Sequence, residues 1–203
     1  MTVSLSRAAR RRWDRWLTAG VLGVAGSAAA LAAGSDAPPQ KAAVCESCHG
    51  IGGRSTLPDT PSLAGQPKQF ITTQLVMFRE GNRKNAIMNP IAAPLSNAEV
   101  NELGSYFSAQ AAEPAGKPLA AGAAAAARGV AERLGCVTCH GAELKGQQHI
   151  PRLAGQHADY LRTQLLGFKA GTRFDMDGNM TAAAQALTPA DIETLARYLS
   201  TLR

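Results

Sequence analysis

Cys45-Glu46-Ser47-Cys48-His49 is the stretch of sequence that decides the fold, and Cys136-Val137-Thr138-Cys139-His140 repeats its pattern in the second half of the 203-residue chain. Both stretches have the form Cys-x-x-Cys-His. On one turn of helix, residues i, i+3 and i+4 share a face, so the two thiols and the imidazole point the same way. The pattern therefore predicts two short helical segments, each presenting two sulfur atoms and one ring nitrogen to a common neighbour.

A c-type haem is the neighbour that this spacing fits. The two thiols form thioethers with the vinyl groups of the haem, while the adjacent histidine coordinates the iron from the tethered side. Two covalently bound haems c are therefore predicted. Their predicted anchors and iron ligands are Cys45, Cys48 and His49 in the first motif, and Cys136, Cys139 and His140 in the second.

Zinc sites, redox dithiols and disulfide frameworks also use paired cysteines. A zinc site does not require a histidine directly after the second cysteine, and a thioredoxin-like dithiol needs a surrounding βαβ pattern that the sequence lacks. The two motifs use all four cysteines of the chain. Two copies behind a secretory leader favour haem over these alternatives.

Residues 1–35 have the pattern of a secretory signal, with five arginines followed by nineteen uncharged residues from Leu17 to Ser35. Small residues crowd its end, so we expect cleavage between Ala30 and Asp36. An uncleaved anchor is the alternative, because a stretch of this length just spans a bilayer. Its alanine and glycine content makes it a poor span. The mature chain is therefore expected in the periplasm, at most peripheral to the membrane.

The net charge of +6 belongs mostly to this leader. Five of the 21 basic residues and one of the 15 acidic residues lie in it, which leaves a formal charge of +2 on the remainder. So small a charge does not predict nucleic-acid binding. Both tryptophans also lie in the leader. The remainder has few aromatic side chains, and two haems would supply apolar volume to its core.

The second half of the chain repeats the first with a period of about 90 residues. Residues 61–66, Pro-Ser-Leu-Ala-Gly-Gln, match residues 151–156, Pro-Arg-Leu-Ala-Gly-Gln. Other matched pairs are Gln74 and Gln164, Phe78 and Phe168, Arg83 and Arg173, Leu95 and Leu187, and Tyr106 and Tyr198. We therefore expect two homologous domains, at 36–110 and 123–203, joined by an exposed linker rich in Pro, Gly and Ala at 111–122.

Each repeat is expected to be all-α, because no stretch alternates convincingly as a strand does. A middle helix is predicted over about 67–80 and its twin over about 157–170, each followed by glycine. The second repeat opens with a predicted helix over 123–134, which Gly135 stops. In the first repeat, the prolines at 38–39 shorten the equivalent helix.

A last helix in each repeat has the signature of a capping box. Ser96 is followed three residues later by Glu99, and Thr188 by Asp191. Both helices are predicted to close on the twin tyrosines of the repeat. Each repeat therefore contains a motif, a middle helix and a capped last helix.

A six-coordinate haem iron needs a second protein ligand opposite the histidine. Met88 and Met180 stand 39 and 40 residues after the motif histidines, in the loop before the last helix. A thioether at that position fits the Met/His ligation of electron-transfer cytochromes. Core filling is the ordinary role of methionine, and Met77 beside Phe78 is assigned to it.

Three other side chains compete for the same role. Met176 is four residues before Met180 in the same loop, but the register of the repeat favours Met180. His149 has no counterpart in the first repeat, and His157 stands where the first repeat has proline. Both are expected to be solvated surface histidines.

These features together resemble the dihaem cytochromes c of the cytochrome c4 family. The resemblance rests on two Cys-x-x-Cys-His motifs, each followed by a Pro-x-Leu-Ala-Gly-Gln run, a helix ending in glycine, a methionine loop and a capped last helix. It implies two class I cytochrome c folds packed against each other. It also implies that the four motif cysteines anchor the haems, that the motif histidines are proximal ligands, and that Met88 and Met180 are distal ligands.

The resemblance makes two further predictions. The backbone near Pro61 and Pro151 should accept a hydrogen bond from the motif histidine, which would fix its ring. The family carries a small glycine where the first helix crosses the last, and Gly129 fits that position. Pro38 stands at the matching place in the first repeat, which departs from the family pattern.

A haem iron with both axial positions filled by protein can pass electrons but has no open site for substrate. We therefore expect an electron carrier with no catalytic residues. The resemblance implies a quinol-oxidising complex as donor and a terminal oxidase as acceptor, through a small, weak contact around an exposed haem edge.

Two alternatives remain open at this point. A dihaem enzyme of the peroxidase type would need Met180 to leave the iron, and Asp175, Asp177 and Gly178 make its loop a candidate for such movement. A haem subunit docked permanently on a catalytic partner, such as a dehydrogenase, can use the same fold.

Overall fold

The computed structural model describes residues 38–203, and the predicted leader with its cleavage site lies outside the described residues. The described part of the chain is helical and has no β-strand, only an isolated bridge between Gln147 and Ile150. The all-α prediction is therefore confirmed. The described residues belong to one compact unit. No helix among the described residues is both long enough and apolar enough to cross a membrane.

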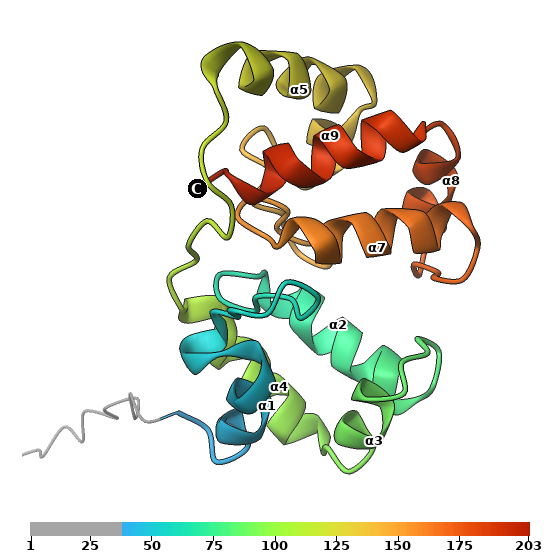
Figure 1. The fold of residues 1–203 in the computed structure, drawn as a ribbon. Coiled ribbons are helices and arrows are strands. Elements are labelled where there is room, and N and C mark those ends of the chain that lie inside the picture. The colour runs from blue at the N-terminus through green and yellow to red at the C-terminus, as the bar shows by residue number, and fades with distance from the viewer. Residues whose placement is uncertain (1–37) are drawn as a thin grey trace, which may run out of the picture. The chain divides into compact units, whose positions relative to one another are not determined.

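Figure 1 shows the helices in chain order. The first repeat contains α1 (Ala42–His49), the 3-10 turn η1 (Ile51–Gly53), α2 (Lys68–Arg79), α3 (Met88–Ala92) and α4 (Asn97–Ala109). The second repeat contains α5 (Ala121–Arg133), α6 (Cys136–His140), α7 (Ala158–Lys169), α8 (Asn179–Gln185) and α9 (Pro189–Ser200). The motif residues lie on α1 and α6, as the spacing of the motif predicts.

Apolar stripes at helical spacing hold each repeat together. In α2, Ile71, Leu75 and Phe78 are spaced i, i+4 and i+7, and the helix packs against α4. In α9, residues 192, 195 and 199 are spaced i, i+3 and i+7, and this helix packs against α5 and α7. Each middle helix therefore lies against the last helix of its own repeat.

The capping boxes form in both repeats as predicted. The Ser96 side chain accepts a hydrogen bond from the Glu99 N–H, and the Glu99 carboxylate accepts one from the Ser96 N–H. Thr188 and Asp191 make the same exchange at the start of α9. Both last helices therefore begin where the sequence places them.

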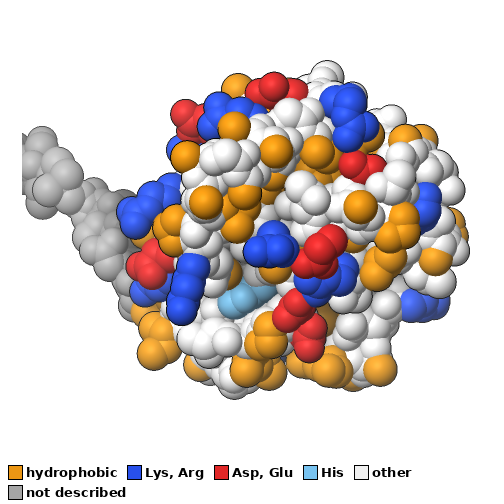
Figure 2. Space-filling view, turned by 45° about the horizontal axis from the view of Figure 1, so that its top comes forward, with side chains coloured by type: hydrophobic (Ala, Val, Ile, Leu, Met, Phe, Trp, Pro, Cys, Tyr) orange, Lys and Arg blue, Asp and Glu red, His pale blue; other side chains and the backbone are white. Residues whose placement is uncertain are grey.

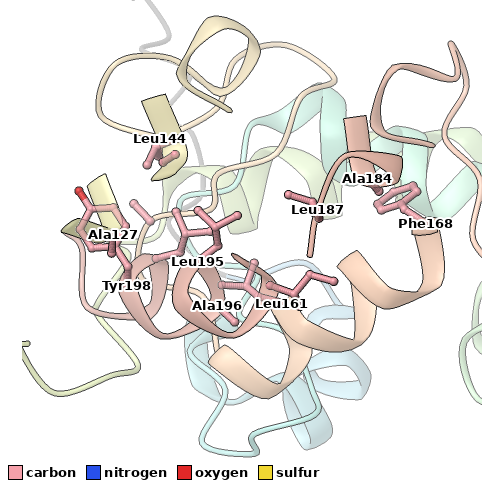
Figure 3. Close-up of a cluster of buried hydrophobic side chains, with 13 residues drawn as sticks. Ala127, Leu144, Leu161, Phe168, Ala184, Leu187, Leu195, Ala196 and Tyr198 are labelled. Carbon is pink, nitrogen blue, oxygen red and sulfur yellow. The ribbon is translucent and has the colours of Figure 1, made fainter. Parts of the chain in front are cut away.

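Each repeat has its own hydrophobic cluster. Leu103 and Phe107 of α4 are the most deeply buried large side chains of the first cluster. In the second cluster, Leu161 comes from α7, Leu187 from the turn before α9 and Leu195 from α9 (Figure 3). The middle and last helices thus contribute large buried side chains to the clusters.

Three details differ from the sequence expectations. The methionine loops contain the short helices α3 and α8, and α5 begins at Ala121, inside the expected linker. The prediction of a close helix crossing at Gly129 is wrong, because a Cβ added there would meet no atom within 4 Å. Ala127 and Ala131, each 1% exposed, face the second cluster instead.

The segment between the repeats is not helical from Ala111 to Ala120. The Ala115 N–H donates to the Gly155 carbonyl at 3.1 Å, and the Gly116 N–H donates to the Ser200 carbonyl at 2.8 Å. The centre of the segment is therefore hydrogen-bonded to the second repeat.

The two repeats contact each other along a seam that includes the first turn of α7. The Tyr160 N–H, a donor that helix geometry leaves free, donates to the Pro58 carbonyl at 3.2 Å. The ring of His157 donates from Nε2 to the Ser55 carbonyl at 2.8 Å. The expectation that His157 is a solvated surface histidine is therefore wrong: it joins the repeats.

Candidate functional site

The motif histidines have the same surroundings in both repeats. His49 is 7% exposed and His140 is 3% exposed. Their Nδ1 atoms lie 2.7 Å from the Pro61 carbonyl oxygen and 2.8 Å from the Pro151 carbonyl oxygen, respectively. Because a carbonyl oxygen can only accept, each Nδ1 carries the proton and each Nε2 keeps the lone pair that a metal needs. These hydrogen bonds agree with the resemblance.

Burial sets the protonation of the motif side chains. It lowers the pKa of both motif histidines, and the hydrogen bond to the proline carbonyl offsets this only in part. The imidazoles are therefore neutral at pH 7, which is the form that binds a metal. Burial also raises the pKa of the Cys45 and Cys136 thiols.

The two thiols of each motif differ in exposure. Cys45 and Cys136 are half-buried, whereas Cys48 and Cys139 are exposed, and all four are free thiols. One predicted attachment point in each repeat thus faces the interior, while the other lies at the surface. An edge of the attached group would therefore reach solvent.

The predicted distal ligands stand at the start of the two short helices. Met88 begins α3 and Met180 is the second residue of α8, and both pack partly buried against the cluster of their own repeat. The Met88 N–H donates to Asn85 Oδ1 at 2.8 Å, and the Met180 N–H donates to Asp175 Oδ2 at 2.8 Å. Matching residues of the repeat therefore hold the two methionine backbones, one with an amide and one with a carboxylate.

Burial and backbone hydrogen bonds distinguish Met180 from Met176, the other methionine of the same loop. Met176 is 72% exposed, whereas Met180 packs against the cluster, so the burial favours Met180 as the ligand. Burial alone would raise the pKa of Asp175, but hydrogen bonds from Met180 and Thr181 hold that pKa below its ordinary value. The carboxylate is therefore charged at pH 7 and fixes the backbone at Met180.

His149 remains a surface residue, as expected from the sequence. Its side chain is 41% exposed, and its Nε2 lies 3.7 Å from a carboxylate oxygen of Asp177.

On the face shown in Figure 2, basic and acidic side chains are interspersed with apolar ones. That face therefore has no continuous patch of positive charge, which a nucleic-acid-binding surface would need.

One cavity of about 780 Å³ brings all eight predicted site residues together. Its volume falls within the range of about 300–1,000 Å³ that is typical of small-molecule and cofactor sites. Apolar side chains of both clusters form much of its wall, among them Phe78, Leu103, Phe168 and Leu195. Thiols for thioether bonds, neutral imidazoles, thioethers and an apolar wall are what a c-type haem requires, so the residues present fit that group.

Two glutamines join the backbones behind the motif histidines across the seam. Gln156 Oε1 accepts from the Ser62 N–H at 2.8 Å, and its Nε2 donates to the Ser62 carbonyl at 2.9 Å. Gln66 makes the same two bonds with Arg152, at 3.0 and 2.9 Å. Both amides are 4% exposed. We call these two pairs the glutamine clamps.

The clamps bear directly on the histidines. Ser62 follows Pro61, whose carbonyl oxygen accepts the His49 proton, and Arg152 follows Pro151 in the same way. Each clamp therefore holds the peptide that orients the motif histidine of the other repeat. The sequence contained one signal for this role, because a glutamine ends the Pro-x-Leu-Ala-Gly-Gln run in both halves. It did not reveal the partner of that glutamine.

Comparisons with known proteins show that the sequence is similar to cytochromes c. The cytochrome c family model matches residues 120–203. A thiosulfate dehydrogenase electron acceptor from Thiomonas intermedia is 39% identical over 188 residues, which covers 85% of this chain and 84% of that protein. A cytochrome c4 from Pseudomonas aeruginosa is 35% identical over 196 residues, which covers 92% of this chain and 95% of that protein.

A solved structure agrees with these sequence matches. The reduced recombinant cytochrome c4 from Pseudomonas stutzeri aligns with a TM-score of 0.71 and 32% identity, over 80% of this chain and 95% of that one. The similarity thus extends over both repeats and nearly the whole length of the relatives.

Proposed function

This chain belongs to the cytochrome c4 family, and we propose that it is a periplasmic electron carrier that holds two haems, one in each repeat. It is an electron-transfer cytochrome c with covalently bound haem c, and its partners are redox proteins. In the proposal, His49 and Met88 ligate one iron and His140 and Met180 the other. When bound, each haem supplies an iron that gains and loses one electron.

The observation that carries the proposal is the common cavity. It is lined by the motif residues and by the two methionines, while the hydrogen bond at each histidine Nδ1 leaves Nε2 available to a metal. The protein would orient the imidazoles through Pro61 and Pro151, hold the methionine backbones through Asn85 and Asp175, and exclude water with its apolar walls. With a histidine and a methionine holding each iron, the chemistry that a bound haem would supply is electron transfer.

We propose the respiratory chain as the setting, with a quinol-oxidising complex as donor and a terminal oxidase as acceptor. Apolar side chains beside the exposed Cys48 support a weak docking contact, since Val44 is 56% exposed and Ile51 is 80% exposed. A small apolar patch at a redox edge suits a short-lived encounter.

A dehydrogenase is the second candidate donor. The relative from Thiomonas intermedia is called a thiosulfate dehydrogenase electron acceptor. By that similarity, a dehydrogenase acting on an inorganic sulfur compound such as thiosulfate would reduce this chain directly. The peroxidase alternative loses support, because Asp175 and the second cluster both hold the segment that carries Met180.

The visible spectrum of the purified full chain tests the ligation. We expect two haems per chain, low-spin spectra in both oxidation states, a far-red sulfur-to-iron band and no reaction with carbon monoxide. Met88→Ala and Met180→Ala should each open one iron to carbon monoxide, whereas Met176→Ala should open neither. Carbon monoxide binding by the unchanged protein would overturn the carrier function in favour of an enzyme.

Stopped-flow reduction distinguishes the two donors. The oxidised protein is mixed either with a quinol-oxidising complex or with a thiosulfate dehydrogenase and its substrate. The faster donor is the assigned one, and Val44→Ser with Ile51→Ser should slow its second-order rate several-fold. Leu166→Ser, at a site 47% exposed on α7, is the matched control and should leave the rate unchanged.

A further inference from the structure

A carboxylate lies inside the first Cys-x-x-Cys-His motif and is held from two sides. Glu46 follows Cys45 on α1. Its Oε1 accepts a hydrogen bond from the Tyr106 hydroxyl of α4 at 2.7 Å and another from the Gly52 N–H of η1 at 2.9 Å. The carboxylate therefore has a fixed position one residue away from a predicted haem anchor.

The Tyr106 hydroxyl is a lasting donor to this carboxylate. The hydrogen bond to Glu46 is the largest of the causes that raise the pKa of Tyr106, and the charge of Arg54 opposes the rise as the weakest cause. The hydroxyl therefore keeps its proton at neutral pH. Both side chains are half-buried. Solvent consequently screens the charge of Glu46 less than it screens a charge on an open surface.

No cation neutralises Glu46 directly. Among residues 38–203, no lysine, arginine or histidine lies within ion-pair distance of it. A cation before each motif is paired instead with a carboxylate of a capping box, Lys41 with Glu99 at 3.6 Å and Arg133 with Asp191 at 3.1 Å. These two ion pairs match between the repeats. Glu46 therefore adds a negative charge that the pairs do not balance.

The second motif has an apolar residue where the first has this carboxylate. Val137 stands at the position that matches Glu46 and packs against the second cluster. Tyr198, the twin of Tyr106, is 4% exposed and belongs to that cluster (Figure 3). The two tyrosines thus occupy matching places, but the first binds a carboxylate and the second packs among apolar side chains.

We propose that Glu46, held by Tyr106 and Gly52, lowers the reduction potential of the first haem by stabilising its ferric form. The inference rests on the proposed function, because it needs a haem in each repeat. It deepens that function by assigning a residue that makes two otherwise similar haem sites unequal. An electron shared by the two haems would reside more often on the second one because of this charge.

The sign of the effect follows from charge. A carboxylate near a haem favours the form with the greater positive charge, which is the ferric form. Glu46→Gln removes the charge but keeps an amide oxygen that can accept both hydrogen bonds. In this variant we expect the ratio of reduced to oxidised first haem at a fixed potential to rise about threefold, which corresponds to about 28 mV for one electron. The ratio at the second haem should stay close to that of the unchanged protein.

The reverse substitution tests the same charge in the second repeat. Val137→Glu places a carboxylate at the matching position, and Val137→Gln is its neutral partner of nearly the same size. Both variants disturb the apolar packing to a similar extent, so the difference between them isolates the charge. At pH 8, the ratio of reduced to oxidised second haem should be about threefold lower in Val137→Glu than in Val137→Gln.

The experiment is a redox titration of the holoprotein followed by haem-resolved nuclear magnetic resonance, which reports each haem separately. Glu102→Gln removes a carboxylate from an exposed position of α4 and is the matched control. It should change neither ratio. Guanidinium unfolding supplies a second readout. A merely structural role of Glu46 would lower the unfolding free energy of Glu46→Gln without a selective change at the first haem.

An unchanged ratio at the first haem in Glu46→Gln, or equal rises at both haems, would overturn the inference. If Glu46→Gln takes up no haem, the two variants of Val137 decide the matter, and equal second-haem potentials in them would count against the role of the carboxylate. The carrier function is tested separately. A low-spin spectrum of the unchanged protein without carbon monoxide binding leaves that function standing, whatever the potentials of these variants.

Discussion

The two repeats hold their motif histidines in the same way and their methionines in different ways. Around the histidines, even the bond lengths agree: Nδ1 lies 2.7 Å from one proline carbonyl and 2.8 Å from the other. Before the methionines, the first repeat uses the amide of Asn85 and the second the carboxylate of Asp175, on a loop two residues longer. The proximal half of the site was thus copied closely after duplication, whereas the distal half diverged.

The difference has a physical reason. Each proximal segment is fixed from two sides, by its own histidine and by a glutamine of the other repeat, so a change in one repeat disturbs both. The methionine segments contact their own clusters and lie on short helices near the surface. A surface segment accepts an insertion more easily than a segment that two domains share. The comparison therefore separates a common part of the site from two local parts.

Removing a glutamine clamp should give the largest effect. Gln66→Leu and Gln156→Leu each leave a partly buried N–H and a partly buried carbonyl without a partner, which costs about 2–4 kcal/mol of unfolding free energy. Guanidinium unfolding of the holoprotein measures the loss. Gln156→Leu should cost more, because Gln156 Oε1 also accepts from the His157 N–H at 3.1 Å. Gln69→Leu, on the exposed side of α2, is the control.

The clamps also predict a crossed effect on the haems. Gln156 holds Ser62 beside the orienting carbonyl of His49, so Gln156→Leu should disturb the haem of the first repeat rather than its own. Haem-resolved nuclear magnetic resonance of the ferric protein assigns the change. A disturbance confined to the haem of the substituted repeat would show that the proximal segments are independent.

The second largest loss of stability is expected from shortening Asp175 and Asn85, the side chains that bind the methionine backbones. Asp175→Ala removes bonds to the Met180 N–H, the Thr181 N–H and the Thr181 hydroxyl. Asn85→Ala removes bonds to the Ile87 and Met88 N–H groups. Bonds to a charged acceptor are the stronger, so we expect a loss of about 2 kcal/mol in the second repeat and about 1 kcal/mol in the first. Carbon monoxide should then bind a larger fraction of the second haem.

The reciprocal exchange sharpens this test. Asp175→Asn gives the second repeat the residue of the first, and Asn85→Asp does the reverse. If the acceptor charge decides the strength of the hold, the carbon monoxide reactivity of the two haems should move in opposite directions. Equal reactivity in all four variants would mean that packing alone holds the methionines.

Helix packing gives a third, smaller contrast. The last helix of the first repeat approaches α2 at Gly104, where a Cβ would lie 2.6 Å from Thr72 Cγ2 and 3.3 Å from the Lys68 carbonyl oxygen. The second repeat has Ala196 at the matching position, fully buried. Gly104→Ala should cost about 1–2 kcal/mol, because overpacking outweighs the gain in helix propensity.

A rescue experiment separates the clash from other effects. Thr72→Ser removes the methyl group that the new Cβ would meet, so Thr72→Ser with Gly104→Ala should recover most of the lost stability in thermal unfolding. Ala196→Gly should cost about 1–2 kcal/mol through lost burial and helix propensity. No rescue by Thr72→Ser would place the cost of Gly104→Ala elsewhere.

The sequence predicted the parts of the fold that local physics determines. Motif spacing, the periodic apolar stripes and the capping boxes at Ser96 and Thr188 act within a few residues, and the helices they predict are present. The short helices α3 and α8 were missed, because five and seven residues are too few to show a helical period. The linker boundary was placed late, because the glycine at 122 looked like a helix breaker.

The contacts between the repeats could not be predicted in the same way. The sequence showed that Gln66 and Gln156 recur, but recurrence does not reveal a partner 86 or 94 residues away. His157 looked like a solvated residue because its bond to Ser55 depends on how the repeats meet. The ligand set itself stays a prediction, although the structure brings all its members to one cavity.

The helix caps offer the smallest contrast. Ser96→Ala and Thr188→Ala each remove the side-chain acceptor of a capping box, which costs about 1 kcal/mol in the unfolding free energy of the holoprotein. We expect the smaller loss for Thr188→Ala, because Pro189 already fixes the first backbone angle of α9. Each change leaves the rest of its helix intact, so haem spectra should stay as in the unchanged protein.

Both capping boxes should also make the stability of the protein depend on pH in the acidic range. Hydrogen bonds with Ser96 lower the pKa of Glu99, and those with Thr188 lower the pKa of Asp191. A carboxyl group whose pKa is lower in the folded state stabilises the fold above its unfolded pKa of about 4, and that stability is lost as pH falls through the folded value. The alanine variants lack the hydroxyl that lowers the pKa of the carboxyl group, so part of this pH-dependent stability is already lost in them. Their unfolding free energy should therefore differ less between pH 7 and pH 3 than that of the unchanged protein. An equal acid effect in Ser96→Ala would mean that the carboxylate caps its helix without the hydroxyl, and the two repeats would then differ in their caps as they do at their methionines.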